Sequence, residues 1–584
     1  MDWRPLFRKK TFEHLSSEAS ESGRESISGL KRVLGVSDLT LFGVAAVIGA
    51  GVFSTIGNAA YHGGPAIVFL FLFTAIACGF CALCYADFAS RVPTSGSAYT
   101  YSYIAFGEII AWIIGWDLLM EYAIGDIAIT ISWSQYFAGL MHFYGWDIPA
   151  HFSLDYMTAS KGYQLVSSLL NQGISLADVA QHGVDPLSLR GYEAWLSAPR
   201  IGSLAVVCDL PALLITALIT WVIFLGMEDS RRFSRFMVFL KMAVIFFVIV
   251  VGIFYVNPQN WVPFAPHGSA GVLKGVSAIF FAYIGFDVIS TMAEECREPQ
   301  RDLPRAMIYS LFICTGIYVI LSLVLTGVVH HSKLQVGDPL AFLFSADGAN
   351  LPWFSGVIAT SAVVALGGVL LVYQLGQTRI WMVMGRDGLL PPFFSRIHPK
   401  YRTPWISTLI SGFLVAIPSL FLNLSEVTDL NSIGTLFAFM LVSAGVLLID
   451  PKEKNSQQKF RMPYVNAKYL YPALMLALLI VTGYLQSRGY VQVLSWGDFS
   501  NFQVLLSKIP LFVFIFMVLV LCLLSYKKSL SFIPVMALTM SSYLTTELGL
   551  KTWIRFGVWL VIGACLYFTY GYKHSRLRHD KIIP

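Results

Sequence analysis

Charged side chains are scarce in this chain. Asp, Glu, Lys and Arg make up only 13% of its 584 residues, whereas 56% are hydrophobic. A soluble domain usually carries about 25% charged residues and about 45–50% apolar ones. The composition therefore excludes an ordinary soluble domain and indicates a chain that crosses a lipid bilayer many times.

Sequence motifs for disulfide frameworks, metal sites, nucleotide binding and catalysis are also missing. The 8 cysteines lie mostly in apolar segments, so no disulfide framework is indicated. Cys78, Cys81 and Cys84 share a helical face, which allows metal ligation but far more often marks close packing. The sequence contains no phosphate-binding glycine loop, no zinc-ligand spacing and no nucleophile–base pair. We therefore expect neither an enzyme nor an ATP-driven pump, and no cofactor or metal.

Long apolar runs occupy most of the chain. A membrane-spanning helix needs about 20 predominantly apolar residues, within a range of roughly 17–25. This criterion predicts about fourteen membrane helices, with about twelve as the alternative because the last four runs are closely spaced. We therefore predict an all-α polytopic membrane protein. The predicted helices cover roughly residues 38–57, 66–89, 108–138, 204–227, 236–256, 273–295, 306–329, 355–385, 405–421, 431–449, 469–485, 508–526, 530–547 and 552–572.

Lys and Arg are unevenly distributed between the segments that join these helices. With the N-terminus in the cytoplasm, most of the 40 basic residues fall in cytoplasmic segments, as the positive-inside rule requires. Residues 1–32 are polar and lack the apolar core of a cleaved signal peptide. We therefore expect both termini in the cytoplasm and the polar insert at 142–203 outside. The net charge of +6 reflects this asymmetry and does not indicate a nucleic-acid partner.

The first apolar run contains a helix-weakening motif, VIGAGVF, in which Gly49 and Gly51 flank Ala50. Each glycine destabilises a helix interior by about 1 kcal/mol relative to alanine. A bilayer does not tolerate broken backbone that faces lipid, so a break here is expected to line an internal cavity. Its free amides could bind an anionic group such as a substrate carboxylate. The alternative is a close-packing face between helices, which Gly-x-Gly also provides.

One lysine, Lys241, lies within the apolar run FSRFMVFLKMAVIFFVIV. Placing a charge inside a membrane helix costs about 2.5–3.5 kcal/mol. One interpretation is a side chain that extends to the cytoplasmic interface near Arg231, Arg232 and Arg235. The other is a buried ammonium that faces the helix bundle and exchanges a proton. The residues alone leave both interpretations open.

Acidic residues also occur inside apolar runs. Glu121 and Asp126 lie in DLLMEYAIGDIAI, Asp117 lies nearer the start of the same helix, and Asp287 lies in AYIGFDVIST. Intramembrane acids commonly mark ion or substrate pathways. Each can instead be structural, satisfied by a hydroxyl or a backbone N–H group, and we favour that interpretation for Asp117.

Long stretches of the chain resemble a known family. GLKRVLGVSDLTLFGVAAVIGAGVF is similar to the opening of the amino acid–polyamine–organocation superfamily, and most closely to its cationic amino acid transporter branch. The similarity continues through YADFASRVPTSGSAYTYSYIAFGE, GWDLLMEYAIGDIA, FAYIGFDVISTMAEECREPQRDLPRAM and GQTRIWMVMGRDGLLPPFFSRIHPKYRTPW. NSIGTLFAFMLVSAGVLL and TWIRFGVWLVIGACLYFTYGYKHSR extend it to the C-terminus. The insert at 142–203 and residues 469–526 depart from the family pattern.

The resemblance implies a LeuT-like fold of two inverted five-helix repeats, in which helices 1 and 6 are broken. About fourteen helices would resemble the animal members of the family, and about twelve the bacterial ones. The expected segments are a cytoplasmic tail at 1–36, a first repeat at 37–256 that contains the insert, a second repeat at 272–450, additional helices at 451–572 and a cytoplasmic tail at 573–584.

The resemblance also implies a substrate site at the two breaks. The carboxylate of an amino acid would bind the amides of Gly49, Ala50 and Gly51. Its ammonium would bind backbone carbonyls beside the breaks, those of Val47, Ile48, Phe281 and Ile284. Its side chain would be recognised by residues of neighbouring helices, namely Glu121, Ile124, Tyr283, Asp287 and Tyr373. Lys241 matches the lysine that takes the place of a sodium ion in proton-coupled bacterial relatives.

Together these expectations describe a secondary active amino acid transporter that works by alternating access, with proton-coupled import. An amino acid exchanger and an amino acid sensor without net transport are the alternatives. The expected partners are an amino acid, a proton and the lipid bilayer of the plasma membrane, or of the inner membrane in a Gram-negative cell. Cationic and neutral substrates are both open, as is a single-span membrane partner.

Overall fold

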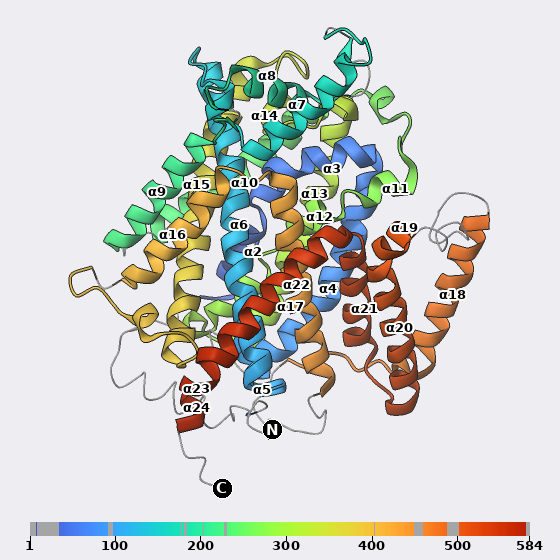
Figure 1. Cartoon of the computed structure of the whole chain (residues 1–584). Coiled ribbons are helices and arrows are strands. Elements are labelled where there is room, and N and C mark those ends of the chain that lie inside the picture. The colour runs from blue at the N-terminus through green and yellow to red at the C-terminus, as the bar shows by residue number, and fades with distance from the viewer. Residues whose placement is uncertain are drawn as a thin grey trace.

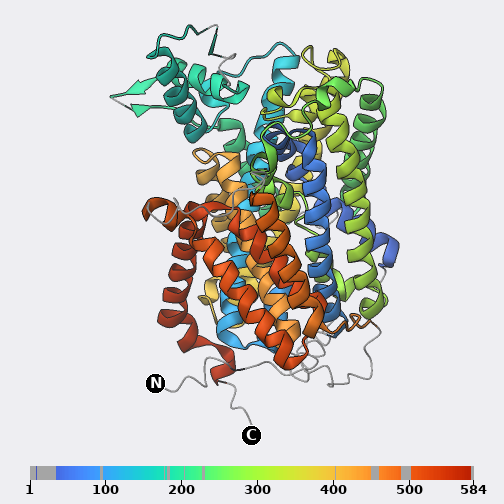
Figure 2. The same cartoon turned by 90° about the vertical axis from the view of Figure 1, so that its right-hand side faces the viewer.

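Helices make up almost all of the described chain. The computed structural model describes residues 8, 34–91, 97–176, 178–179, 184–202, 204–226, 231–401, 403–448, 460–487 and 502–579. Figures 1 and 2 show a bundle of long helices with a smaller helical cap at one end. The predicted tail at 1–36 lies almost entirely outside the described residues.

The first part of the bundle contains the break that the VIGAGVF motif predicts. Helix α2 ends at Val47, and a turn of π-helix, η2, follows from Gly51. The apolar run at 38–57 is therefore divided into two half-helices. The elements of this part are α2 (Val36–Val47), η2 (Gly51–Thr55), α3 (Ile56–Gly63), η3 (Gly64–Ala66), α4 (Ile67–Arg91), α5 (Ser97–Ala105), α6 (Glu108–Phe143), α9 (Leu210–Leu225) and α10 (Arg231–Ile253).

The cap is the polar insert between α6 and α9, and Figure 2 shows it projecting beyond the ends of the long helices. Asp155 and Asp185 cap its two main helices, because each carboxylate accepts a 2.8 Å hydrogen bond from the backbone N–H three residues later. The insert also has a small hydrophobic core of its own around Leu154 and Ala194. Its elements are η4 (Ala150–Phe152), α7 (Tyr156–Leu170), α8 (Pro186–Ser197) and the antiparallel strands β1 (Arg200–Ile201) and β2 (Leu204–Ala205).

A second divided helix opens the next part of the bundle. Helix α12 ends at Phe281, and a stretch of 3-10 helix, η7, follows from Asp287. The elements here are η6 (Pro258–Trp261), α11 (Gly268–Leu273), α12 (Val276–Phe281), η7 (Asp287–Glu295), α13 (Pro299–Val328), η8 (His331–Lys333), α14 (Pro339–Phe342), α15 (Pro352–Arg386), η9 (Pro392–Ser395), α16 (Trp405–Ser419) and α17 (Leu424–Leu448).

The remaining helices follow the last four predicted runs to within a few residues. They are α18 (Ala467–Ser487), α19 (Phe502–Ser507), α20 (Ile509–Lys528), α21 (Phe532–Thr546), α22 (Gly549–Leu566), η11 (Tyr567–Gly571), α23 (Tyr572–His574) and α24 (Arg576–His579). Figure 1 shows α18, α20 and α21 at one side of the bundle and α22 running obliquely across its front.

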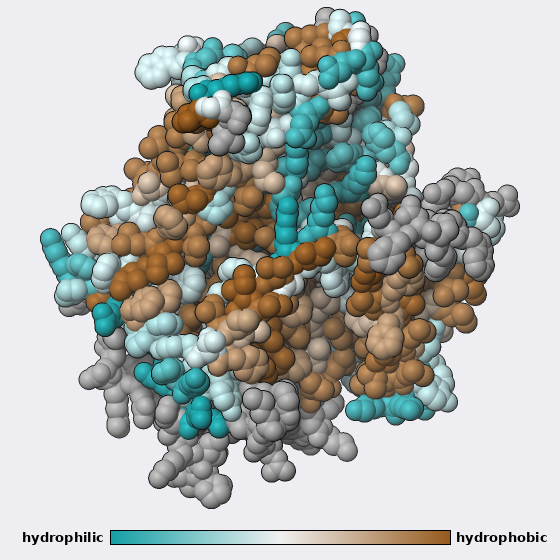
Figure 3. All heavy atoms as spheres, viewed as in Figure 1, coloured by the Kyte–Doolittle hydropathy of each residue, from teal (hydrophilic) through white to brown (hydrophobic). Residues whose placement is uncertain are grey.

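The outer surface of the bundle is apolar. In the described part of the chain, seven helices are long and apolar enough to cross a bilayer, and five shorter apolar helices accompany them. Large side chains such as Phe312 and Phe516 are 75% and 69% exposed on this surface. Figure 3 shows apolar residues across the middle of one face. An all-α polytopic membrane protein is therefore confirmed, whereas the count of about fourteen helices stays a prediction.

Helix α6 is the central element of the bundle and packs along both α15 and α17, while α4 packs along α13. The close approach of α6 and α15 depends on glycines, which have no side chain to keep the helices apart. A Cβ atom at Gly376 would lie 2.6 Å from Tyr122 Cε1, and one at Gly125 would lie 3.0 Å from Tyr373 Cε1. These glycines let the two helices pack at a distance that places Tyr373 beside α6.

A tryptophan contact fixes α22 against α6. The rings of Trp116 and Trp559 stack with centroids 4.4 Å apart, and each indole N–H donates to the backbone carbonyl of the other residue, at 2.9 and 3.2 Å. The Trp112 indole adds a 2.9 Å hydrogen bond to the carbonyl of Gly563. Two rings and three hydrogen bonds therefore attach the oblique helix to the centre of the bundle.

We expect Trp559→Ala to loosen α22 and lower the thermal stability of the purified protein in detergent. The loss should be somewhat less than the about 3–5 kcal/mol of a fully buried tryptophan, because Trp559 is only partly buried. Trp221→Ala is the matched control, since Trp221 is 61% exposed on the apolar surface of α9. Equal melting temperatures for the two variants would contradict this account of the docking.

Candidate functional site

The first helix break exposes backbone groups at both of its ends. Ile48 leaves the helix with an extended backbone (φ −78°, ψ 91°), and Ala50 already has helical angles. The first N–H groups of a helix have no acceptor in a preceding turn, and the last carbonyls have no donor in a following one. The Thr55 hydroxyl joins this region to α12, since its oxygen lies 2.7 Å from the carbonyl of Gly51 and 3.0 Å from that of Ala278.

The second break lies directly against the first. Between α12 and η7 the backbone passes through Gly285 at φ +119°, a conformation that favours glycine. A Cβ atom there would lie 2.9 Å from the carbonyl carbon of Ala46, and one at Gly51 would lie 2.8 Å from the nitrogen of Ala282. The two irregular segments therefore touch backbone to backbone, and no side chain fits between them.

Tyr318 of α13 connects the two breaks. Its hydroxyl donates to the carbonyl of Ala282 at 2.8 Å and lies 3.1 Å from the carbonyl of Val47. The tyrosine is fully buried. One hydroxyl group thus serves carbonyls that both helices leave free, and we expect its removal to disturb both breaks at once.

Lys241 of α10 lies inside the bundle, where its side chain is only 4% exposed. Its Nζ donates a 3.0 Å hydrogen bond to the carbonyl of Ile48 and a second one to the carbonyl of Ala45. The ammonium therefore occupies the C-terminal end of α2, where free carbonyls carry partial negative charge. Of the two interpretations of the sequence, the geometry favours the buried ammonium over a side chain that extends to the interface.

A cavity opens where the two breaks meet. It is small and has free room for only about one water molecule, so an amino acid could enter only if its walls moved apart. The walls combine backbone from both breaks with apolar side chains of α6 and α15. The lining residues are Ala46, Val47, Gly49, Ala50, Gly51, Ile129, Phe281, Ile284, Val369 and Tyr373.

Comparison with known proteins identifies the family. Residues 34–505 match the family described as amino acid permease, and residues 530–575 match the family described as the C-terminus of such permeases. The chain belongs to the amino acid permease family. This confirms the resemblance seen in the sequence, namely the amino acid–polyamine–organocation superfamily and its cationic amino acid transporter branch.

Several relatives match this permease over nearly their whole length. A branched-chain amino acid permease and a methylthioribose transporter, both of Bacillus subtilis, are each 33% identical to it over 98% of this chain and 99% of their own length. A vacuolar cationic amino acid transporter of Arabidopsis thaliana is 29% identical over 95% of this chain and 94% of its own. The names of these transporters thus cover three different kinds of solute.

Seven residues that the sequence indicated line the cavity of the permease: Val47, Gly49, Ala50, Gly51, Phe281, Ile284 and Tyr373. Ala46, Ile129 and Val369 also line it and were not predicted. Val369 lies one helical turn before Tyr373 on α15, so helical spacing was a signal for it. Ile129 lies one helical turn after Gly125 on α6. Tyr373 of α15 packs against Gly125, and this contact between the two helices, which the sequence does not show, brings Ile129 to the cavity.

The other predicted residues lie around the cavity rather than in its wall. Ile48 is buried and its carbonyl accepts from Lys241. Tyr283 turns away, since its hydroxyl donates to the carbonyl of Phe71 at 3.1 Å. Glu121, Ile124 and Asp287 are not among the residues that line the described cavity. Both of these acids are buried, with side chains 5% and 7% exposed.

Several buried acids of the core have carboxylate oxygens without a hydrogen-bond partner in the described structure. In the described structure, neither carboxylate oxygen of Asp117 or of Asp126 has a hydrogen-bond partner, and one oxygen of Asp287 also has none. A buried, ionised and unpaired carboxylate is strongly unfavourable, so such groups usually take up a proton.

We expect Gly51→Ala to abolish substrate binding, because the added methyl group overlaps Ala282 and forces the two breaks apart. Overpacking of this kind costs about 1–3 kcal/mol. Gly79→Ala is the matched control, since its Cβ would lie 3.8 Å from Leu311 Cδ2, an ordinary contact outside the cavity wall. The measurement is uptake by proteoliposomes, together with the melting temperature. Wild-type uptake by the Gly51 variant would contradict the tight contact between the breaks.

Proposed function

We propose that this permease imports amino acids as a secondary active transporter that works by alternating access. The observation that carries the proposal is the cavity at which two broken helices meet. A free amino acid has a carboxylate and an ammonium on one carbon, and the broken helices offer complementary backbone groups for both. The carboxylate would accept from the amides of Gly49, Ala50 and Gly51, while the carbonyls beside Val47 and Phe281 would receive the ammonium.

The cavity walls support a neutral substrate with an apolar side chain. Beyond the backbone groups, the lining consists of aliphatic and aromatic side chains, chiefly Ile129, Phe281, Ile284, Val369 and Tyr373. A cationic side chain would need a facing anion, and none of the buried acids in the described part of the chain lines this space. The relative named as a branched-chain amino acid permease supports the same choice. Recognition of a cationic side chain by Glu121 or Asp287 is the alternative, supported by the relatives named as cationic amino acid transporters.

Lys241 is the proposed site of proton coupling. In its charged form the side chain donates to two carbonyls at the end of α2, so it ties α10 to the first break. Loss of the proton would weaken both hydrogen bonds and the attraction to the helix end. The tie between α10 and α2 would then loosen, and the backbone that holds the substrate would be free to move. The hydrogen bonds between Lys241 and α2 would thereby couple proton release to release of the amino acid.

The arrangement of the helices supports two inverted repeats at 37–256 and 272–450. Each repeat opens with an apolar run that is broken near its middle, first between α2 and η2 and then between α12 and η7. Broken helices in corresponding positions are typical of transporters with inverted repeats. We place the additional helices at 451–572, both termini in the cytoplasm, and the insert on the outer side of the plasma membrane.

The coupling role predicts a specific loss in Lys241→Met. Wild-type proteoliposomes should take up labelled leucine faster when the inside is alkaline, whereas the variant should respond little to the gradient. Exchange of leucine without a gradient should persist in the variant, which shows that the substrate site is intact. Lys528→Met is the control, because Lys528 is an exposed residue at the end of α20. A variant that responds to the gradient as wild type does would rule out the coupling role.

Competition measurements test the substrate class. Uptake of labelled leucine should be inhibited by isoleucine, valine and other apolar amino acids, and little by lysine, arginine or ornithine. Because a wrong side chain in an apolar pocket usually changes binding by about 1–3 kcal/mol, inhibition constants should differ by roughly 10- to 200-fold. Inhibition by the cationic amino acids alone would refute a neutral substrate and leave the amino acid transport function standing.

A further inference from the structure

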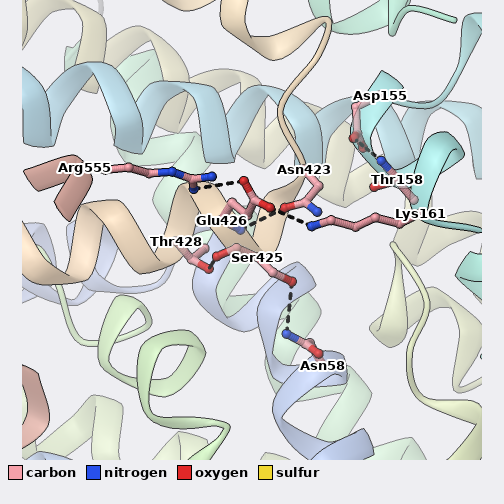
Figure 4. A network of polar contacts seen from close by, with 9 residues as sticks. All are labelled: Asn58, Asp155, Thr158, Lys161, Asn423, Ser425, Glu426, Thr428 and Arg555. Atoms are coloured by element: carbon pink, nitrogen blue, oxygen red, sulfur yellow. Dashed lines mark hydrogen bonds and ion pairs between the residues drawn. The ribbon is translucent and has the colours of Figure 1, made fainter. Parts of the chain in front are cut away.

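A network of polar contacts surrounds the first turn of α17, at the end of the bundle that carries the insert. At its centre, the Glu426 carboxylate forms ion pairs with Lys161 of α7 at 2.6 Å and with Arg555 of α22 at 2.9 Å. Figure 4 shows the two cations reaching the same carboxylate from opposite sides. One acidic group thus joins the insert, the second half of the bundle and the oblique helix.

The residues next to Glu426 extend the network. Asn58 of α3 donates a 3.3 Å hydrogen bond to the hydroxyl of Ser425. The Asn423 side chain caps α17 by accepting from the N–H of Glu426 at 2.9 Å, and the N–H of Met157 in the insert donates to the carbonyl of Phe421 at 3.1 Å. Figure 4 shows that Asn58 approaches Ser425 from below, whereas Arg555 and Lys161 approach Glu426 from the left and the right.

Helix α3 is the outer half of the broken first helix, so its position bears directly on the cavity. It continues from the π-helical turn that begins at Gly51, which lines the cavity. Its other side is tightly packed as well, since a Cβ atom at Gly57 would lie 2.5 Å from the carbonyl oxygen of Leu334 and 2.9 Å from Pro339 Cβ. A movement of α3 away from α17 would therefore change the wall of the cavity and stretch the contact between Asn58 and Ser425.

The three charged side chains are partly exposed to solvent, so their ion pairs can form and break without unfolding the protein. Glu426 is 21% exposed, whereas Lys161 and Arg555 are 57% and 46% exposed. Exposed ion pairs contribute little to folding. A conformational equilibrium, however, responds to any contact that exists in only one of its states. The network is therefore better suited to biasing a conformation than to holding the fold together.

We propose that Glu426 is a positioning residue that, through the first turn of α17 and the Ser425–Asn58 contact, holds α3 in place and keeps the cavity closed at the insert end. The inference rests on the proposed transport function and assigns a role to the insert, which supplies Lys161. It also assigns one to α22, which supplies Arg555. Breaking the network frees α3 and shifts the permease towards the state that is open at the insert end.

The test is the kinetics of leucine uptake from the insert side for Glu426→Gln, which keeps the shape of the side chain and removes its charge. A larger fraction of permease that is open at the insert end lowers the apparent KM, because more of the protein is then in the conformation that binds leucine. Closure around the substrate becomes less favourable, so kcat falls. We expect both constants to fall several-fold. A purely structural defect would lower the amount of active protein and leave KM unchanged.

The salt dependence of KM is a second test, and it can be measured on the wild-type protein, whose folding no substitution has altered. Exposed charges are screened over about 10 Å at 0.1 M ionic strength and over shorter distances at higher salt. Raising the salt concentration on the insert side should move the wild-type KM towards that of Glu426→Gln and leave the variant unaffected. Glu193→Gln is the matched control, because Glu193 is an exposed acid of α8 in the same insert. Its kinetics and salt response should equal those of wild type.

Further variants keep the inference testable if Glu426→Gln fails to fold. Asn58→Ala removes the link to α3, and Lys161→Gln or Arg555→Gln removes one cation. Each should lower KM in the same direction, and Glu426→Asp should restore part of the wild-type behaviour. Wild-type KM in all these variants would overturn the role of the network while leaving transport established. Absence of uptake of both apolar and cationic amino acids by the wild-type permease would instead refute the proposed function.

Discussion

The architecture of this permease depends on the need to satisfy free backbone groups inside a bilayer. Each broken helix releases N–H and carbonyl groups where no water is available, and leaving them unpaired costs several kcal/mol each, to order of magnitude. Tyr318 and Lys241 supply partners for some of the carbonyls. The groups that remain free face a cavity of limited size. The same constraint that makes a broken helix unfavourable thus leaves the backbone groups on which the proposed amino acid site depends.

Backbone recognition and side-chain recognition are separated in this site. In the proposed site, the broken helices would provide the groups that any amino acid meets, whereas side chains of α6, α15 and the second break would provide the wall that meets its side chain. This division is consistent with relatives whose names cover branched-chain amino acids, cationic amino acids and methylthioribose. A change at Ile129 or Val369 can alter the substrate while the backbone of the breaks stays the same.

Sequence patterns predicted what is local and missed what depends on distant packing. Paired glycines weaken a helix wherever they occur, and a lysine in an apolar run is conspicuous, so Gly49, Gly51 and Lys241 could be identified directly. The role of Tyr318 could not, because its partners are carbonyls that become free only when two remote helices break. Glu426 likewise looks like an ordinary acid at the start of a helix, since its two cations come from the insert and from α22.

The position of Arg555 on α22 has a consequence for how the protein matures. Chains fold from the N-terminus as they are synthesised, so the two broken helices are in the membrane well before α22 emerges. Until then Glu426 lacks one of its two cations, and α6 lacks the ring that stacks on Trp116. A half-made permease can therefore contain a complete cavity whose outer contacts are still unfinished.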